Sequence, residues 1–411
     1  MVKVSEIKDG ESLEAWLLDR SEYETKIFAI TIAHRAAMRV LPLYWEWVET
    51  SDVAKKRDLK TLPVLRCNLI SGVAREMPTP EIRAAALTSR NPVITAMGKT
   101  IASGTTSSAA TIGADASGRA VTIAAFDDVR ASARFSAKAA SCVDVASPFT
   151  SRTAIATALW KQLRNDCDAL QNRDELVTTT LWNDGENPFQ KEWDAVRQSL
   201  PVATPARSEE TTLGVVPVDW SFWINWYQDA LEGREPDWDM LEEIALILDE
   251  DWEKGPEHIN NQVIAGIVGK YRLLRDVQAL RKELAAVRQT ATAAPMGHNN
   301  PPEGIEAEAE VVTQTEIIWD ALEEAEEELS KPEPSPSVLK RVGVAILGAL
   351  KKALKYSVGL LDIALKSAAK EGGAIFGKWG ARGVIAWIAV QNPHLVSLGQ
   401  QLIEYANSLR K

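Results

Sequence analysis

The chain has 411 residues, enough for two or three domains with ample hydrophobic core. Its formal net charge of −11 disfavours a general nucleic-acid binder and favours solubility. No run of about twenty apolar residues indicates a membrane span, and the polar start Met1–Glu6 does not resemble a signal peptide. We therefore expect a cytoplasmic protein.

The cysteines and histidines do not predict a metal site. Cys67, Cys142 and Cys167 are far apart, odd in number and without ligand spacing, so we interpret them as reduced, partly buried thiols. His34 lies in an apolar-rich stretch without a second ligand nearby, which favours a satisfied or surface histidine. We expect no metal, no cofactor and no catalytic group from these residues.

Residues 1–213 are predicted to be a multi-helix N-terminal region. The capping-box pair Ser21 and Glu24 starts a helix that we expect to end before Pro42. Asp174 is predicted to cap a helix that continues through Trp182, and Asn187-Pro188 to start another with Trp193 inward.

A small-residue part of this region lies near 85–157. Helices over 120–135 and 137–146 fit its alanine content, although its Gly, Ser and Thr weaken them. A short strand at 121–123 or partial disorder also fits. We favour helices.

Residues 214–289 are the Trp-rich segment. Asp219 is predicted to cap a helix in which Trp220, Trp223 and Trp226, followed by Tyr227, form one aromatic stripe. A packed helix–helix interface explains the stripe best. A stacking platform for a ligand or nucleobase is the alternative, but nearby carboxylates argue against nucleic acid.

Further helices are predicted within the same segment. Gly233 is expected to end the first one in a left-handed conformation, and Asp237 and Pro256 to start the next two. The last helix then has apolar residues at a 4-3-4-3 spacing, typical of a coiled-coil seam. The seam residues are Leu273, Val277, Leu280, Leu284 and Val287. They predict either an intramolecular hairpin or a dimer contact.

The remaining chain alternates between linkers and charged helices. Residues 290–304 are predicted to be a linker, and 305–330 an acidic helix with ten acidic residues and no basic one. A stiff proline-rich spacer, 331–337, precedes basic amphipathic helices over 338–411. Within these, Asn392-Pro393 is expected to start the final helix.

The basic segment has a polar stripe that includes Lys352, Lys355, Lys366 and Lys370. Two structures fit this pattern. The helix either packs in a bundle with its lysines in water, or lies in a membrane interface through residues 338–390. The stretch 372–379 nearly matches a phosphate-binding loop, but Trp379 replaces the magnesium-binding Ser or Thr and no strand precedes it.

Two short motifs carry a resemblance. Gly297-His298-Asn299-Asn300-Pro301-Pro302-Glu303 and the Asp219-Trp220-x-x-Trp223-x-x-Trp226-Tyr227 segment resemble stretches of uncharacterised alphaproteobacterial proteins, some of them phage-associated. The resemblance covers about a quarter of the chain. It implies a bacterial or prophage origin and no mechanism.

These observations predict an all-α protein in which the N-terminal region is joined by flexible linkers to a C-terminal helical module. The leading hypothesis is a non-enzymatic interaction or scaffold protein whose basic C-terminal segment is masked by the acidic helix. It would bind a protein partner or itself through helices. The predicted contact residues are Trp220, Trp223, Trp226, Tyr227, Lys352, Lys355, Lys366 and Lys370.

Two further hypotheses remain open. A membrane-active effector would use residues 338–390 on an anionic surface, with peripheral attachment to the inner membrane. An enzyme whose site assembles from distant residues is the weaker alternative.

Overall fold

The computed structural model describes residues 2–101, 108–142, 152–172, 176–183, 187–201, 217–292, 302–368 and 380–409. Within these ranges the chain is all-α, with no strand, so the predicted fold class is confirmed. Its contacts divide the chain into two compact units, Met1–Ala265 and Gly266–Lys411. The division falls inside the predicted Trp-rich segment, within its long last helix.

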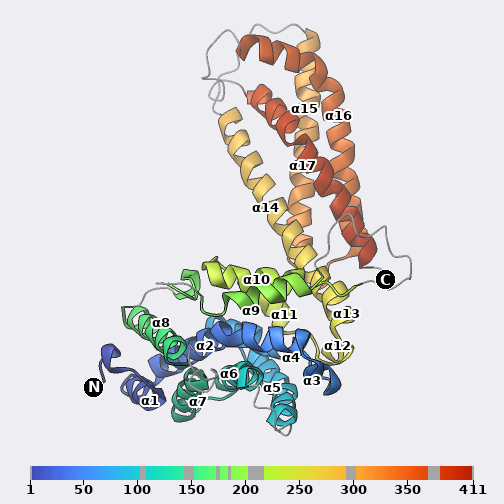
Figure 1. Ribbon diagram of the computed structural model, residues 1–411. Helices are drawn as coiled ribbons and strands as arrows, with labels where there is room; N and C mark the ends of the chain where they lie inside the picture. The colour runs from blue at the N-terminus through green and yellow to red at the C-terminus, as the bar shows by residue number, and fades with distance from the viewer. Residues whose placement is uncertain are drawn as a thin grey trace. The chain divides into compact units, whose positions relative to one another are not determined.

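The described residues of the first unit include the α-helices α1 to α13 (Figure 1). They are α1 (Gly10–Leu18), α2 (Glu22–Thr50), α3 (Asp52–Lys56), α4 (Leu62–Glu76), α5 (Pro80–Ile101), α6 (Ser108–Ala125), α7 (Val129–Ser141), α8 (Arg152–Asn172), α9 (Gln190–Ser199), α10 (Ser221–Glu232), α11 (Trp238–Ala245), α12 (Asp249–Glu253) and α13 (Pro256–His258). Short 3-10 helices cover Val4–Glu6 and Leu176–Thr178, and a π-helix covers Ile259–Ile264.

Helix α2 is the core of this unit, and α1, α4, α6, α7, α8 and α9 all pack against it. The predicted capping box is present, since Ser21 Oγ accepts from the Glu24 amide and Glu24 from the Ser21 amide. The expected end before Pro42 is wrong, because α2 continues through Pro42 to Thr50. Every residue from Arg35 to Trp45 is buried on this helix, so packing on all sides outweighs one missing amide hydrogen bond.

The small-residue helices allow close packing around α2. Residues 121–123 are helical, so helix is confirmed over the strand alternative. One continuous helix over 120–135 is wrong, because α6 ends at Ala125 and Asp128 caps α7 by accepting from the Ala131 amide. A methyl group on Gly113 of α6 would stand 2.5 Å from Tyr44 Cβ, so only glycine fits this crossing.

The Trp-rich helices begin and end largely as predicted. Gly233 ends α10 with a φ of 67°, Asp237 caps α11, and Pro256 opens α13. Asp219 differs slightly, since Trp220 occupies the cap position while Asp219 accepts from the Ser221 amide at 2.9 Å. Asn260 of the π-helix accepts from Trp223 Nε1, which ties this turn to the aromatic core.

Two other predicted helix boundaries are wrong. Residues 176–183 form one 3-10 turn followed by bends rather than a helix through Trp182, and the expected cap Asp174 lies outside the described residues. The final helix does not start at Asn392-Pro393, because α17 passes through Pro393 without ending. The helix from Asn187-Pro188 is confirmed as α9, with Trp193 buried.

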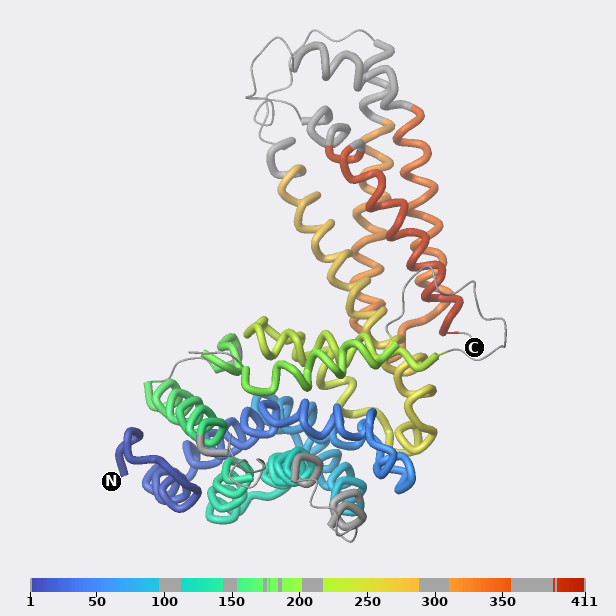
Figure 2. Tube along the Cα trace, viewed as in Figure 1, coloured from blue at the N-terminus to red at the C-terminus, as the bar shows by residue number. Residues whose placement is uncertain are grey.

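The second unit is an antiparallel four-helix bundle of α14 (Ala265–Thr292), α15 (Pro302–Leu329), α16 (Pro336–Ala368) and α17 (Gly380–Ser408) (Figure 2). Helix α14 contacts α15 through Arg281 and Glu326, and α17 through Glu283 and Gln391. Helix α16 packs on α15 and α17 from the opposite side. Four of the five predicted seam residues of α14 are buried in this core and the fifth, Val287, is partly buried against it, so the seam is an intramolecular contact.

Two local contacts shape the bundle. Glu328, at the end of α15, pairs with Lys331 at 2.7 Å and accepts from the Ser335 amide, which fixes the turn into α16. Gly343 of α16 lies against α17, where an added Cβ would stand 2.6 Å from the Gly399 carbonyl oxygen. Glycine at both positions therefore lets the two backbones approach closely.

Candidate interaction surface

Neither a metal centre nor a membrane span is found in the part of the chain that the structure describes. Within it, no group of three His, Cys, Asp or Glu side chains is arranged to hold a metal ion. None of the helices searched there has the length and apolar character needed to cross a membrane. The stretch 372–379, whose sequence nearly matches a phosphate-binding loop, lies outside the described residues.

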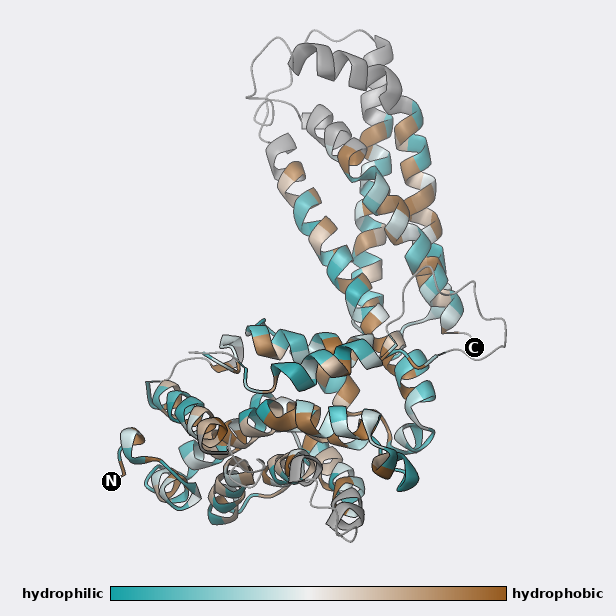
Figure 3. Ribbon diagram, in the orientation of Figure 1, coloured by the Kyte–Doolittle hydropathy of each residue, from teal (hydrophilic) through white to brown (hydrophobic). Residues whose placement is uncertain are grey.

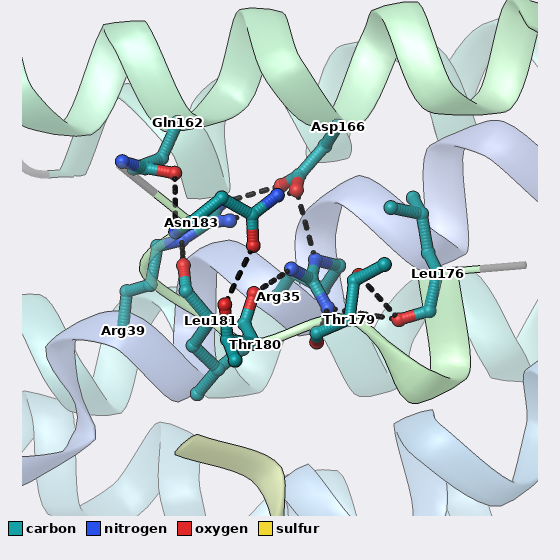
Figure 4. A network of polar contacts seen from close by, with 9 residues as sticks. All are labelled: Arg35, Arg39, Gln162, Asp166, Leu176, Thr179, Thr180, Leu181 and Asn183. Carbon is teal, nitrogen blue, oxygen red and sulfur yellow. Dashed lines mark hydrogen bonds and ion pairs between the residues drawn. The ribbon is translucent and has the colours of Figure 1, made fainter. Parts of the chain in front are cut away.

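A buried polar network joins α2 to α8 in the first unit (Figure 4). Arg35 and Arg39 project from α2 toward Asp166 on α8. Arg39 is bidentate, with distances of 2.6 and 2.9 Å, and Arg35 Nε donates at 3.0 Å. All three side chains are 6% exposed or less. One carboxylate balances only one of the two positive charges. The other charge therefore requires further hydrogen-bond acceptors.

Backbone carbonyl groups supply that compensation. Arg35 donates to the carbonyl oxygens of Leu176, Thr179 and Thr180, and Arg39 Nε donates to Leu181 at 2.8 Å (Figure 4). The network thus ties the 176–183 segment to α2 and α8 through buried charged side chains.

The electrostatics of the network fit a structural role. Burial alone would raise the pKa of Asp166, but the charges of Arg35 and Arg39 and their hydrogen bonds outweigh it, so the pKa lies below its usual value. Burial lowers the pKa of Arg35 to about 10, which leaves the guanidinium charged at neutral pH. Asp166 is therefore an ionised carboxylate between two cations.

His34 and the thiols are also structural. His34 Nδ1 lies 2.9 Å from Ser71 Oγ, and burial, with help from Arg75 and Arg35, lowers its pKa to about 3. The three cysteines are free and buried, and burial raises the pKa of Cys67 to about 12. The prediction of a satisfied histidine is confirmed for His34, and the cysteines are free thiols as predicted.

The predicted aromatic contact residues lie mostly inside the first unit. Trp220, Trp223 and Tyr227 are buried, and Trp226 is half-buried. Their rings pack edge-on or tilted against one another and against Trp45 and Trp193 on α2 and α9. The interpretation of the stripe as a packed helix interface is therefore confirmed. Among the four rings, Trp226 alone presents much surface to a partner.

One cleft in the first unit, of about 550 Å³, is lined by Arg20, Tyr23, Phe28 and Gln171 among others. Its polar groups already have local roles, because Ser21 and Glu24 form the α2 capping box and Arg20 donates to Gln171.

Helix α16 presents its cations along one exposed side, which we name the basic ridge. Its members are Lys340, Arg341, Lys351, Lys352 and Lys355. Val344, 56% exposed, and the exposed Gly348 lie along the same side. The opposite side is buried in the bundle core through Val342, Ile346, Ala349, Leu350 and Ala353. Figure 3 shows the resulting mix of hydrophilic and hydrophobic residues along α16.

Helix α15 presents the opposite sign along an acidic ridge. The ridge consists of Glu316, Asp320, Glu323 and Glu327, all exposed. On its flank, Glu324 pairs with Arg341 across the α15–α16 contact. Ile317, on the same side of α15 as Glu324, is 38% exposed. The two ridges therefore run beside each other on one surface of the bundle.

Sequence reasoning found part of this surface. Lys352 and Lys355 are exposed as predicted, while the side chain of Lys366 and the whole of Lys370 lie outside the described residues. Lys340 and Lys351 were missed because they flank the stripe rather than lie on its line. Arg35 and Arg39 were also missed. Two arginines four residues apart in an apolar helix indicate buried cations that need a carboxylate from elsewhere in the chain.

A search for similar proteins returned no matching family model, no matching curated protein and no matching solved structure. The resemblance to alphaproteobacterial and phage-associated proteins therefore stays a prediction. The first part of its Gly297–Glu303 motif lies outside the described residues.

Proposed function

We propose that this chain is a non-enzymatic interaction or scaffold protein that binds protein helices through the charged surface of its C-terminal bundle. The observation that carries the proposal is the basic ridge of α16, which stays exposed while the apolar side of the same helix is buried. A cluster of exposed cations attracts a partner surface of opposite charge.

The acidic helix has a defined part in this proposal. Helix α15 covers the apolar side of α16 and pairs Glu324 with Arg341, which supports the predicted masking of the basic segment. Lys351 and Lys352 remain exposed beside it. Masking by opposite charge, as predicted, is supported at the Glu324–Arg341 pair, while the exposed Lys351 and Lys352 stay available to an acidic partner.

A membrane-active effector is the second candidate, and the exposed lysines favour it. Lysines beside an anionic lipid surface contribute about 1 kcal/mol each. Insertion into the interface, however, would require residues 338–354 to leave the bundle core in which their apolar side chains are buried. Peripheral electrostatic attachment is the form of this candidate that keeps the bundle intact.

Affinity capture with the full chain tests the proposal. The wild type is compared with Lys351→Glu/Lys352→Glu and with the control Arg272→Glu/Lys282→Glu, which makes the same charge change on exposed positions of α14. We expect the wild type and the control to retain a helical protein partner in stoichiometric amounts, and the ridge variant to lose it. Equal retention by all three, or by none, contradicts the proposal.

The same three proteins separate the membrane candidate. They are floated with vesicles of phosphatidylcholine alone and of phosphatidylcholine with phosphatidylserine. Binding to the anionic vesicles that the ridge variant alone loses would favour the membrane candidate. Absence of flotation by the wild type at low salt removes it.

A further inference from the structure

We infer that the acidic and basic ridges form a self-complementary surface that binds a second copy of this chain, which deepens the proposed function and rests on it. The ridges belong to neighbouring antiparallel helices of one bundle, α15 and α16. Each ridge is exposed, and each is of the charge that the other requires. A second copy presents an acidic ridge and a basic ridge separated by the same distance as in the first copy.

The helix register places the ridges at the same level. The pair Glu324–Arg341 joins α15 to α16 at one level. Because the helices run in opposite directions, Ile317 and Gly348, each seven residues further from the connecting turn, also share a level. Glu316 of α15 and Lys351 of α16 then lie within about one helical turn, or 5 Å, of each other along the bundle.

A two-fold axis parallel to the helices, in the groove between α15 and α16, uses this arrangement. Rotation about this axis packs α15 of each copy against α16 of the other and does not translate either copy along the helices. The acidic ridge of each copy then meets the basic ridge of its partner, and the contact occurs twice. An axis across the helices would instead place acid on acid and base on base, which is unfavourable.

The centre of the surface is apolar and uncrowded. Ile317 and Val344 are exposed there, and a Cβ placed on Gly348 would meet no atom within 4 Å. In the dimer, Ile317 of one copy lies at the same height along the helices as Gly348 of the other. The missing side chain of Gly348 leaves room for it. An apolar centre surrounded by charges of both signs is typical of a specific protein interface.

Salt dependence gives the first test on the full chain. Sedimentation equilibrium over micromolar concentrations should give a dimer at low salt. The dissociation constant should rise by about tenfold or more in high salt, since exposed charges are screened. A wild-type chain that stays monomeric at low salt overturns the inference.

Charge reversal gives the second test. One variant is Glu316→Lys/Asp320→Lys and the other is Lys351→Glu/Lys352→Glu, and each alone should be monomeric. Mixed together they should form a heterodimer. The first carries lysines at 316 and 320 beside an unchanged basic ridge, and the second carries carboxylates at 351 and 352 beside an unchanged acidic ridge. All four changes in one chain should restore the homodimer.

The controls are Asp276→Lys/Glu404→Lys and Arg272→Glu/Lys282→Glu, which change the charge equally on exposed positions of α14 and α17. Both should dimerise as the wild type does. Failure of the mixture and of the fourfold variant to dimerise, while circular dichroism shows folded helices, rejects this pairing. A monomeric wild type that still captures another helical protein through Lys351 and Lys352 would leave the proposed function standing without this inference.

Discussion

Asp166 is the buried carboxylate on which two arginines of the first unit depend. It is fully buried and is the shared partner of Arg35 and Arg39. Removing one member of a buried ion pair leaves the other charge buried without a partner. In the intact pair, the attraction between the charges only offsets the free energy lost when both leave water. The network thus confers little net stability when intact and costs much when broken.

Asp166→Asn should lower the free energy of unfolding by about 3–5 kcal/mol, because it leaves two buried guanidinium groups without a carboxylate. Urea unfolding followed by circular dichroism measures this change. The matched control is Asp168→Asn, an exposed carboxylate two residues further along α8, which should change stability by no more than about 0.5 kcal/mol. Similar effects of both substitutions would contradict the role given to the network.

The pKa of Asp166 also fixes the sign of its pH dependence. Its pKa is lower in the folded protein than in the unfolded chain. Its contribution to stability is therefore fully present above the unfolded value and is lost as the pH falls through the lower, folded value. Near neutral pH the network stays ionised.

At the scale of helices, glycine decides how closely α16 and α17 approach. Gly343→Ala should destabilise the second unit by about 1–3 kcal/mol, because the new methyl group overlaps the α17 backbone at Gly399. Gly348→Ala on the same helix should instead stabilise by up to about 1 kcal/mol, since its Cβ enters open space and alanine favours helix.

The two glycine substitutions are compared by thermal unfolding in high salt, so that self-association does not contribute. Opposite signs are expected from the same chemical change on one helix. If both variants stabilise the chain, the contact between Gly343 and Gly399 is not a tight crossing.

Sequence patterns predicted helix faces better than helix ends. The inward sides of α14, α16 and α17 follow apolar periodicity, and the structure buries them. The ends at Pro42 and Pro393 were mispredicted because proline costs one hydrogen bond, which packing on the rest of a long helix offsets. A break at Asp128 was missed because alanine-rich sequence continues on both sides.

The candidate surface divides in the same way. The exposure of Lys352 and Lys355 follows from the period of α16 alone, so it was predictable. The Asp166 partner of Arg35 is 131 positions away in sequence, and no local pattern connects the two. The side-by-side placement of the ridges likewise depends on the turn held by Glu328, which sets the register between α15 and α16.

For the molecule as a whole, each of the two units has a buried core of its own. Leu65 lies in the core of Met1–Ala265 and Leu322 in that of Gly266–Lys411, and both are buried. Separate cores predict separate cooperative transitions rather than one. A stability measurement on this chain therefore has to be assigned to a unit.

Leu65→Ala and Leu322→Ala should each cost about 2–5 kcal/mol through the lost contacts and the cavity left behind. Hydrogen exchange read out by mass spectrometry of peptides should place the loss in the mutated unit, with the other unit's protection unchanged. Faster exchange throughout the chain in either variant would mean that the units unfold as one.

The location of the thiols has a practical consequence. All three cysteines of the chain belong to Met1–Ala265, and all are buried. Burial raises the pKa of each, so little reactive thiolate forms while the unit is closed. The rate of alkylation by a maleimide therefore measures how often the first unit opens and does not respond to opening of the second. The natural cysteines serve as the probe, so no label has to be introduced.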